Sequence, residues 1–430
     1  PGTPGARAGL QAGDQIIEVN GESTRDWDTD LAVSKLRGPQ GSAVNIKVAR
    51  GGVDQPIPIR IVREEIHIQA VPTAYMMDGN VGYVELISFS ESSTAELREA
   101  IRELVAAGAR GVILDLRANP GGLLDQGVAV ADLFLNRGQT VVETKGRASN
   151  QNQRAVARTS DQFPGLPIIV LVGPQSASAS EIVAGALQDH DRALVLGRTT
   201  YGKGSVQSLY PLENNNWLKI TTARWYTPVG RSIQKPYGID AHLVEEDVGG
   251  ASAAADTAER PTYRTDSGRT VLGGGGIHPD LVLTPDTLTS EERLFIQAMQ
   301  KSFAEYINAR LNFAVAYLRE TPNLQPGFAV TPQLLDRFYQ AIRQAGVDVD
   351  RDLYDRAARW VANDIGDEIT YAKWGQKAAR QRTNSDDPQV MTAADLLRRA
   401  STPESLFALA QSPDAVRNAA REPDMTPSPR

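Results

Sequence analysis

The sequence predicts an α/β protein in which a buried parallel sheet lies between a β-rich segment and an all-helical region. Two nearly all-apolar runs, residues 111–117 and 166–173, are typical of strands buried on both faces. Each run is followed by a short loop and a helical pattern, and this alternation favours parallel strands joined by right-handed crossovers. From Thr289 onward the apolar residues repeat only with the helical period.

Length and composition exclude several classes of function. With 430 residues, of which 41% are hydrophobic, we expect two to four domains. The net charge of -7 argues against nucleic acid or an anionic membrane as the main partner. The chain has no cysteine, and its four histidines show no ligand spacing, so we predict no metal and no cofactor. It has no run of 18 apolar residues, so no membrane-spanning helix is expected.

The first 66 residues alternate turns with short β-rich runs. Residues 14–21 predict a strand closed by an Asn-Gly turn, and a helix over 29–36 and strands over 43–50 and 55–62 follow. The chain opens without an initiator Met, on a stretch that reads as the middle of a domain. We therefore expect a fragment or mature piece, and a lost export signal or membrane anchor stays open.

Residues 67–288 form the predicted α/β core. Residues 205–227 favour an antiparallel ribbon, and the Gly-rich stretch at about 244–276 predicts a flexible insertion. The expected strands cover 81–89, 111–117, 166–173 and 193–197, and the expected helices cover 91–107, a segment ending near 135, and 181–188.

Residues 289–412 predict a helical domain. Thr289 and Glu292 form a capping signal ahead of a long periodic run. Further helices fit 331–345, 348–378 and 392–410. The apolar periodicity indicates packing against the core or against another copy, and the more specific hypothesis is a homo-oligomer formed through this region. The polar, Pro-rich residues 413–430 predict a disordered tail.

Two loops leave the carboxyl ends of the buried strands, where sites form in open α/β sheets. They are residues 118–122, which contain NPGG, and residues 173–180, which contain SASAS. If their strands are neighbours, the loops face one another. Both loops start helices, and unpaired backbone N–H groups there can stabilise an oxyanion.

Lys203 is expected to return to the same end of the sheet. The helix after the serines carries the chain roughly 15 Å away, and strand 193–197 brings it back. A lysine becomes a general base only if burial lowers its pKa by several units, and Gln207 could hold the amine. His190 lies at the far end and is a poor base. The alternative is that the serines only cap a helix and Lys203 is a surface turn residue.

Five segments then resemble the C-terminal processing peptidases, also called tail-specific proteases. QSASASEIVAGALQD with GRTTYGKGSVQ carries the strongest similarity. DLRANPGGLLDQGVAVADLFL, RWYTPVGRSIQ (224–234) and GIHPDLVL (276–283) are similar to further signatures, and residues 4–24 resemble the second half of a PDZ domain. The resemblance implies a crotonase-like or ClpP-like protease core behind a PDZ domain, residues 1–66, that lacks its first strand and carboxylate-binding loop.

The resemblance implies a role for each matching residue. Ser178 would be the nucleophile, Lys203 the base and Gln207 its support. The oxyanion would bind the backbone N–H of Ala179 and of a glycine, either Gly121 or Gly122. The implied activity is cleavage of proteins or peptides with free C-termini, outside the cytoplasm, in the periplasm or cell envelope.

Arg37 is a candidate regulatory contact between the PDZ and protease domains. The family often has a glycine-bounded arginine at this place, although an ordinary turn arginine is the alternative.

Two other functions remain open. One is a PDZ-bearing scaffold with an inactive protease fold. The other is a crotonase-like enzyme that stabilises a thioester enolate. Enolate chemistry needs no Ser/Lys pair. The presence of the pair therefore distinguishes a peptidase from a crotonase-like enzyme, whereas fold analogy alone would not.

Overall fold

The computed structural model describes residues 3–11, 13–50, 53–213, 216–235, 260–284 and 288–412. The chain divides into two compact units. The first combines Pro1–Ile68 with Leu288–Thr383, and the second combines Gln69–Thr287 with Asn384–Arg430. Within these described ranges, no helix is both long enough and apolar enough to cross a bilayer.

The N-terminal part of the first unit is a four-stranded antiparallel sheet. Asn20 and Gly21 have φ angles of 49° and 88°, as the predicted tight turn requires. Its small core consists of apolar residues at alternating strand positions, which face inward. Val44, Ile46 and Val48 are among them. The sheet order is β2-β1-β3-β4, with β1 Gln15–Val19, β2 Glu22–Ser23, β3 Ala43–Ala49 and β4 Ile57–Val62, next to the helices α1 Pro4–Arg7 and α2 Thr29–Leu36.

The rest of the first unit is helical and has its own aromatic core around Phe295, Tyr306 and Phe338. The single helix expected over 348–378 is wrong. The chain breaks at Ala357 and again at Gly375, whose φ of 82° a helix cannot contain. The helices are α6 Ser290–Met299, the short η4 Gln300–Ser302, α7 Phe303–Glu320, α8 Pro332–Gln344, α9 Arg351–Arg356, α10 Ala358–Trp374 and α11 Gln376–Ser385.

The second unit is built on a six-stranded sheet of order β16-β11-β10-β7-β6-β5. Every pair in it is parallel except β5–β6 at one edge. This arrangement confirms the predicted parallel sheet. The strands are β5 Thr73–Met77, β6 Val81–Glu85, β7 Gly111–Asp115, β10 Ile168–Val172, β11 Leu194–Gly197 and β16 Leu281–Val282.

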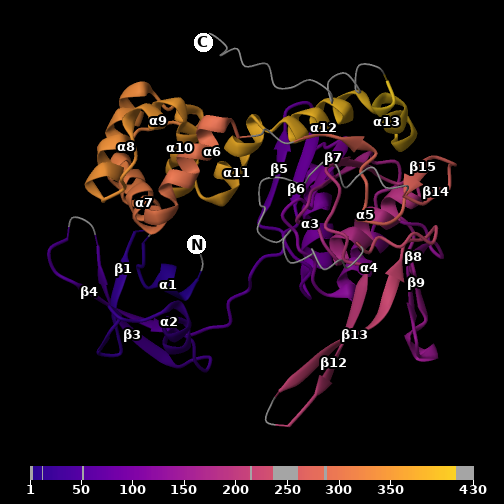
Figure 1. Ribbon diagram of the computed structural model, residues 1–430, viewed down its shortest axis with the longest axis horizontal. Helices are drawn as coiled ribbons and strands as arrows, with labels where there is room; N and C mark the ends of the chain where they lie inside the picture. Colours follow the sequence, from indigo (N-terminus) through magenta and orange to yellow (C-terminus); the bar gives the residue numbers. More distant parts are fainter. Residues whose placement is uncertain are drawn as a thin grey trace. The chain divides into compact units, whose positions relative to one another are not determined.

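Helices cover both faces of this sheet (Figure 1). On one face Val112 and Val170 pack with α3 Ser93–Ala106, α4 Leu124–Asp132 and α5 Ala179–Asp189. On the other face Ile113 and Ile169, one position along each strand, pack with α12 Pro388–Arg399 and α13 Pro403–Ala410. Successive residues of one strand point to opposite faces of the sheet. Because both faces are buried, the sequence of each strand is apolar along its length.

The helical region is therefore shared between the units, whereas one helical domain over 289–412 was expected. Helices α12 and α13 belong with the sheet because polar contacts fix the start of α12. Arg117, at the end of β7, donates to Asp115 and to Asp387 at 2.6 and 2.5 Å. Gln389 Nε2 donates to the carbonyl of Leu283 at 2.6 Å.

A second, antiparallel sheet of order β12-β13-β8-β9 extends from the core (Figure 1). Its strands are β8 Thr140–Gly146, β9 Gln153–Val156, β12 Ser205–Pro211 and β13 Trp217–Tyr226, with the short η1 Ser149–Gln151 between β8 and β9. This confirms the ribbon predicted over 205–227. Its tip exposes Leu209 and Trp217, and the far end of β13 buries Trp225 in the core.

The flexible insertion expected at about 244–276 is wrong for residues 260–276, which form the hairpin β14 Thr262–Arg264 and β15 Thr270–Leu272. Arg269 fixes the hairpin by pairing with Asp191 and Asp280 at 2.6 and 2.5 Å. Glycine at 276 reflects close packing, because a Cβ there would overlap the carbonyl of Thr200. Residues 244–259 and the expected disordered tail 413–430 lie outside the described residues.

We predict that Asp189→Asn destabilises the second unit. Asp189 and Arg231 form an ion pair with no exposed side-chain surface, at the end of α5. Burial raises the pKa of Asp189 and lowers that of Arg231, and their mutual attraction opposes both shifts. Removing one partner should leave the other charge uncompensated and cost about 3–5 kcal/mol.

Urea unfolding, followed by hydrogen exchange in peptides from β10 and α5, measures this loss. The exposed pair of Arg351 and Asp336 supplies the control, since Asp336→Asn should cost less than about 1 kcal/mol. Equal, small effects of the two substitutions would contradict the prediction.

Candidate active site

Three loops meet at the carboxyl edge of the parallel sheet. Strand β10 pairs with both β7 and β11, so the loops that follow these strands are neighbours. The N–H of Ala177 donates to the carbonyl of Asn119 at 3.1 Å, and the N–H of Tyr201 donates to the carbonyl of Ser176 at 3.0 Å. The predicted meeting of the NPGG, SASAS and YGKG loops is therefore confirmed.

The three serines of the SASAS loop have different surroundings. Ser176 and Ser180 are fully buried, and their hydroxyls donate to the carbonyls of Leu116 and Asn119 at 2.7 and 2.8 Å. Ser178 lies between them, half-buried, and its hydroxyl makes no capping hydrogen bond to the helix that it begins. Two of the serines thus hold the loops together, and the hydroxyl of Ser178 is available for chemistry.

Ser178 also has an unfavourable backbone conformation. Its φ of 56° and ψ of -113° lie outside the regions that residues with a Cβ prefer. Such strain persists only where the surroundings enforce it, and it is concentrated at functional sites. The residue stands at a sharp turn between β10 and α5, which projects its side chain from the edge of the sheet, as a nucleophile on a strand–turn–helix does.

Lys203 is half-buried on the loop after β11. Its carbonyl accepts a hydrogen bond from the indole of the buried Trp225 at 3.1 Å. On one side of it, Gly202 has a φ of 88°, which favours glycine, and a Cβ there would lie only 3.1 Å from the backbone nitrogen of Gly276. The structure records no hydrogen bond between Lys203 Nζ and Ser178 Oγ, both of which belong to described residues.

The link between Ser178 and Lys203 is Glu181, which the sequence reasoning did not assign to the site. Glu181 Oε2 accepts the backbone N–H of Ser178 at 2.8 Å and that of Lys203 at 2.9 Å. Because the two bonds end on one atom, the two backbone nitrogens are no more than 5.7 Å apart. The spacing S-x-x-E of a capping box was the available signal.

The two glycines of NPGG differ in their hydrogen bonds. The N–H of Gly121 donates to Asn119 Oδ1 at 2.9 Å. A Cβ on Gly121 would lie 2.6 Å from the carbonyl oxygen of Ala177 and 2.8 Å from Ser178 Cβ, so this backbone lies directly against the serine. In the part of the chain that is described, the N–H groups of Gly122 and Ala179 donate to no acceptor.

The remaining candidate residues lie further from this centre. Gln207 is exposed on β12, at a bulge between Val206 and Gln207. His190 ends α5, opposite to Ser178, and contacts Asp266 and the carbonyl of Thr140, both at 2.7 Å.

Arg37 belongs to the first unit, where it ends α2. Its side chain is exposed, and it forms no ion pair with any residue that the structure describes.

No group of three or more His, Asp or Glu side chains is arranged to hold a metal ion among the described residues.

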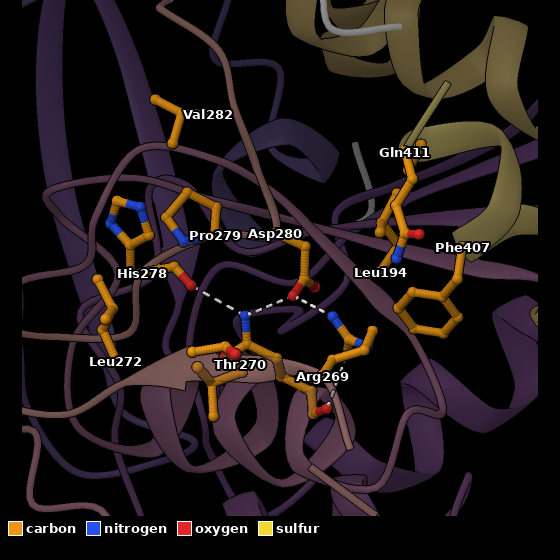
Figure 2. Close-up of a pocket in the computed structure, with 13 residues that line it drawn as sticks. Leu194, Arg269, Thr270, Leu272, His278, Pro279, Asp280, Val282, Phe407 and Gln411 are labelled. Carbon is orange, nitrogen blue, oxygen red and sulfur yellow. Dashed lines mark hydrogen bonds and ion pairs between the residues drawn. The ribbon is translucent and has the colours of Figure 1, made fainter. Parts of the chain in front are cut away.

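A separate cavity of about 440 Å³ lies near β16 and α13 (Figure 2). Leu194, His278 and Phe407 line it, and none of the candidate catalytic residues does. Its charged groups satisfy one another, because Arg269 pairs with Asp280 and Asp191 and stacks 4.3 Å from the ring of Phe407. This cavity is therefore distinct from the catalytic edge.

Sequence comparisons agree with this geometry. The profile of Peptidase family S41 matches residues 80–244, and that of the PDZ domain matches residues 1–50. The carboxy-terminal-processing protease of Bartonella bacilliformis is 46% identical over 248 residues, which are 57% of this chain and 56% of that protein. The carboxy-terminal processing protease CtpA of Bacillus subtilis is 36% identical over 234 residues, 54% of this chain and 49% of that protein.

Among solved structures, the photosystem II D1 C-terminal processing protease is 32% identical, with a TM-score of 0.34, and the match covers 54% of this chain and 64% of that one. The chain spans about half the length of the curated relatives that it matches. Ser178, Lys203 and the loops around them all lie inside residues 80–244. Residues 80–244 of the chain therefore match peptidase family S41, and residues 1–50, which precede them, match a PDZ domain.

Proposed function

We propose that this chain is a serine endopeptidase that cleaves protein substrates near their C-termini, with Ser178 as nucleophile and Lys203 as general base. The observation that carries the proposal is the contrast among the three serines. Two hydroxyls donate to backbone carbonyls, whereas the hydroxyl of Ser178 donates to no acceptor among the residues that the structure describes. The same serine sits at a strained turn and shares the carboxylate of Glu181 with the base loop.

The proposed reaction begins with the amine of Lys203 in its neutral form. The amine takes the proton of the Ser178 hydroxyl while the oxygen attacks the peptide carbonyl, and the ammonium then protonates the leaving amine. Water, activated by the same amine, hydrolyses the ester on Ser178 and releases the second product. No histidine takes part, which is consistent with the position of His190 at the opposite end of α5.

The oxyanion of the tetrahedral intermediate needs two donors that are not already used. The N–H groups of Ala179 and Gly122 meet this requirement, whereas that of Gly121 is bonded to Asn119. We therefore assign Gly122, with Ala179, to the oxyanion hole. Gly121 has a steric role, since its missing side chain lets the loop approach Ser178.

We assign to Gln207 a hydrogen bond to the amine of Lys203 in the substrate-bound state. An amide oxygen can orient an ammonium group without adding charge. Gln207 follows Lys203 by four residues, and the bulge beside it re-aims the strand locally.

The preference for C-termini is supported by the PDZ segment, since PDZ domains bind extended peptides by strand addition. Mass spectrometry of the cleavage products of an unfolded protein tests this preference. An extracytoplasmic location, a homo-oligomer formed through the helical region and membrane association stay predictions.

We predict that Ser178→Ala lowers turnover of such a protein by several orders of magnitude, as loss of a nucleophile does in other serine enzymes. The fold should stay intact, because that hydroxyl makes no capping bond. Ser176→Ala and Ser180→Ala are the matched controls, and each should cost about 1–3 kcal/mol of stability by unpairing buried backbone groups. Wild-type cleavage by Ser178→Ala would refute the assignment.

We also predict that Lys203→Arg is inactive at every pH, although it keeps the length and charge of the side chain. A guanidinium group stays protonated in proteins and cannot accept the proton of Ser178. Initial rates measured across the pH range that leaves the protein folded check this prediction, and an active arginine variant would exclude Lys203 as the base.

For Arg37, we propose a regulatory contact with the protease domain. Arg37→Ala should lower kcat/KM for a protein substrate by about 5-fold or more, the lower end of typical coupling between sites. Arg60→Ala removes another exposed arginine of the same unit and serves as the control. Unchanged activity of the Arg37 variant would remove the hypothesis.

A further inference from the structure

Glu181 is a fully buried carboxyl group with an unusual set of partners. Its side chain has no exposed surface, and it accepts four hydrogen bonds. Oε2 receives the N–H groups of Ser178 and Lys203, and Oε1 receives the N–H of Gly202 at 2.7 Å and the hydroxyl of Thr200 at 2.5 Å. No cationic side chain among the described residues pairs with it.

Burying such a group is costly unless hydrogen bonds replace its lost water. Burial raises the pKa of Glu181, and the hydrogen bonds from Thr200, Lys203, Gly202 and Ser178 oppose this shift. The three backbone donors have fixed positions, so the carboxyl group in turn fixes the backbone that carries them. The Glu181 carboxyl group is therefore held by two different loops at once.

A second glutamate in the same chain shows what ordinary helix capping requires. Glu292 occupies the third position of α6, as Glu181 does in α5, and both accept the N–H of their N-cap residue at 2.8 Å. Glu292 is also buried, but it pairs with the guanidinium of Arg359 at 2.7 and 2.8 Å and also has a backbone hydrogen bond with the adjacent Trp360. Capping thus explains one bond of Glu181 and leaves those to residues 200–203 unexplained.

Those extra bonds reach only the loop that carries the base. Thr200 is itself anchored, because its hydroxyl accepts the N–H of Ile277 at 2.7 Å. Among the described residues, the N–H groups of Gly202 and Lys203 donate only to this carboxyl, which therefore ties the backbone on both sides of that peptide unit to the backbone of Ser178.

We infer that Glu181 is a positioning residue, which sets the separation of nucleophile and base by binding the backbone of both. The inference rests on the proposed function, since it assigns the Ser178–Lys203 pair a common support. Glu181 touches no reacting atom and acts through Lys203. An amide cannot replace it, because either orientation would point an NH₂ group at a backbone N–H of Gly202 or of Ser178 and Lys203.

The test is a kinetic comparison of Glu181→Gln with the wild type on a fluorescence-quenched peptide. A misplacement of about 1 Å can cost about 100-fold in rate, so we expect kcat to fall by about that factor while KM stays within about 2-fold. Glu292→Gln makes the same chemical change at the same helix position in the first unit and should keep wild-type kcat and KM.

A double-mutant cycle separates positioning from a general structural effect. If Glu181 acts through Lys203, Glu181→Gln should have little further effect in a Lys203→Ala background, measured as residual cleavage over long incubations. The inference would be overturned if the fold-loss of activity in the double variant equalled the product of the fold-losses of the two single variants. A wild-type kcat in Glu181→Gln would also overturn it. The same holds if the fall in kcat is no larger than the fraction of the Glu181→Gln protein that is unfolded at the assay temperature.

A second variant covers the case in which Glu181→Gln does not fold. Thr200→Val removes one donor to Oε1 and keeps the shape of the side chain, and it should lower kcat with KM unchanged. Failure of the proposed function is recognised separately, because Ser178→Ala and Lys203→Ala would then cleave at the wild-type rate. Failure of this inference alone leaves those two variants inactive and both Glu181→Gln and Thr200→Val fully active.

Discussion

The site depends on the parallel pairing of β7, β10 and β11. This pairing brings three loops, distant in sequence, to one edge of the sheet. Neither strand nor loop alone could align Ser178 with Lys203, because the helix α5 and strand β11 separate them. The packing of helices on both faces excludes water from the sheet, and it fixes the strand ends to which the loops are attached.

Around this edge the polar groups divide their tasks. Asn119 receives bonds from the SASAS loop through its carbonyl and holds Gly121 through its side chain. Ser176 and Ser180 use their hydroxyls to join the loops. Glu181 binds the SASAS and YGKG loops together. Among the described residues of these loops, the hydroxyl of Ser178 and the N–H groups of Ala179 and Gly122 stay without an acceptor, and acyl transfer requires groups of these kinds.

Much of this organisation could be predicted from the sequence, because the buried strands are continuous apolar runs and the loops carry distinctive glycines and serines. Three features could not. The sequences of helices α12 and α13 resemble those of the preceding helices, and only tertiary contacts, such as that of Arg117 with Asp387, show which core they join. The Gly-rich residues 273–276 resemble a flexible segment in the sequence, although close packing against the carbonyl of Thr200 requires glycine at 276. Glu181 looked like an ordinary capping glutamate, since its bonds to residues 200–203 depend on tertiary structure.

The most direct test is to trap the covalent intermediate. An acid quench during turnover of a peptide ester, followed by mass spectrometry of the digested protein, locates any acyl group. The account predicts an acyl adduct on the side chain of Ser178, and none in the Lys203→Arg variant. An adduct on Ser176 or Ser180, or turnover with no adduct on any serine, would contradict it.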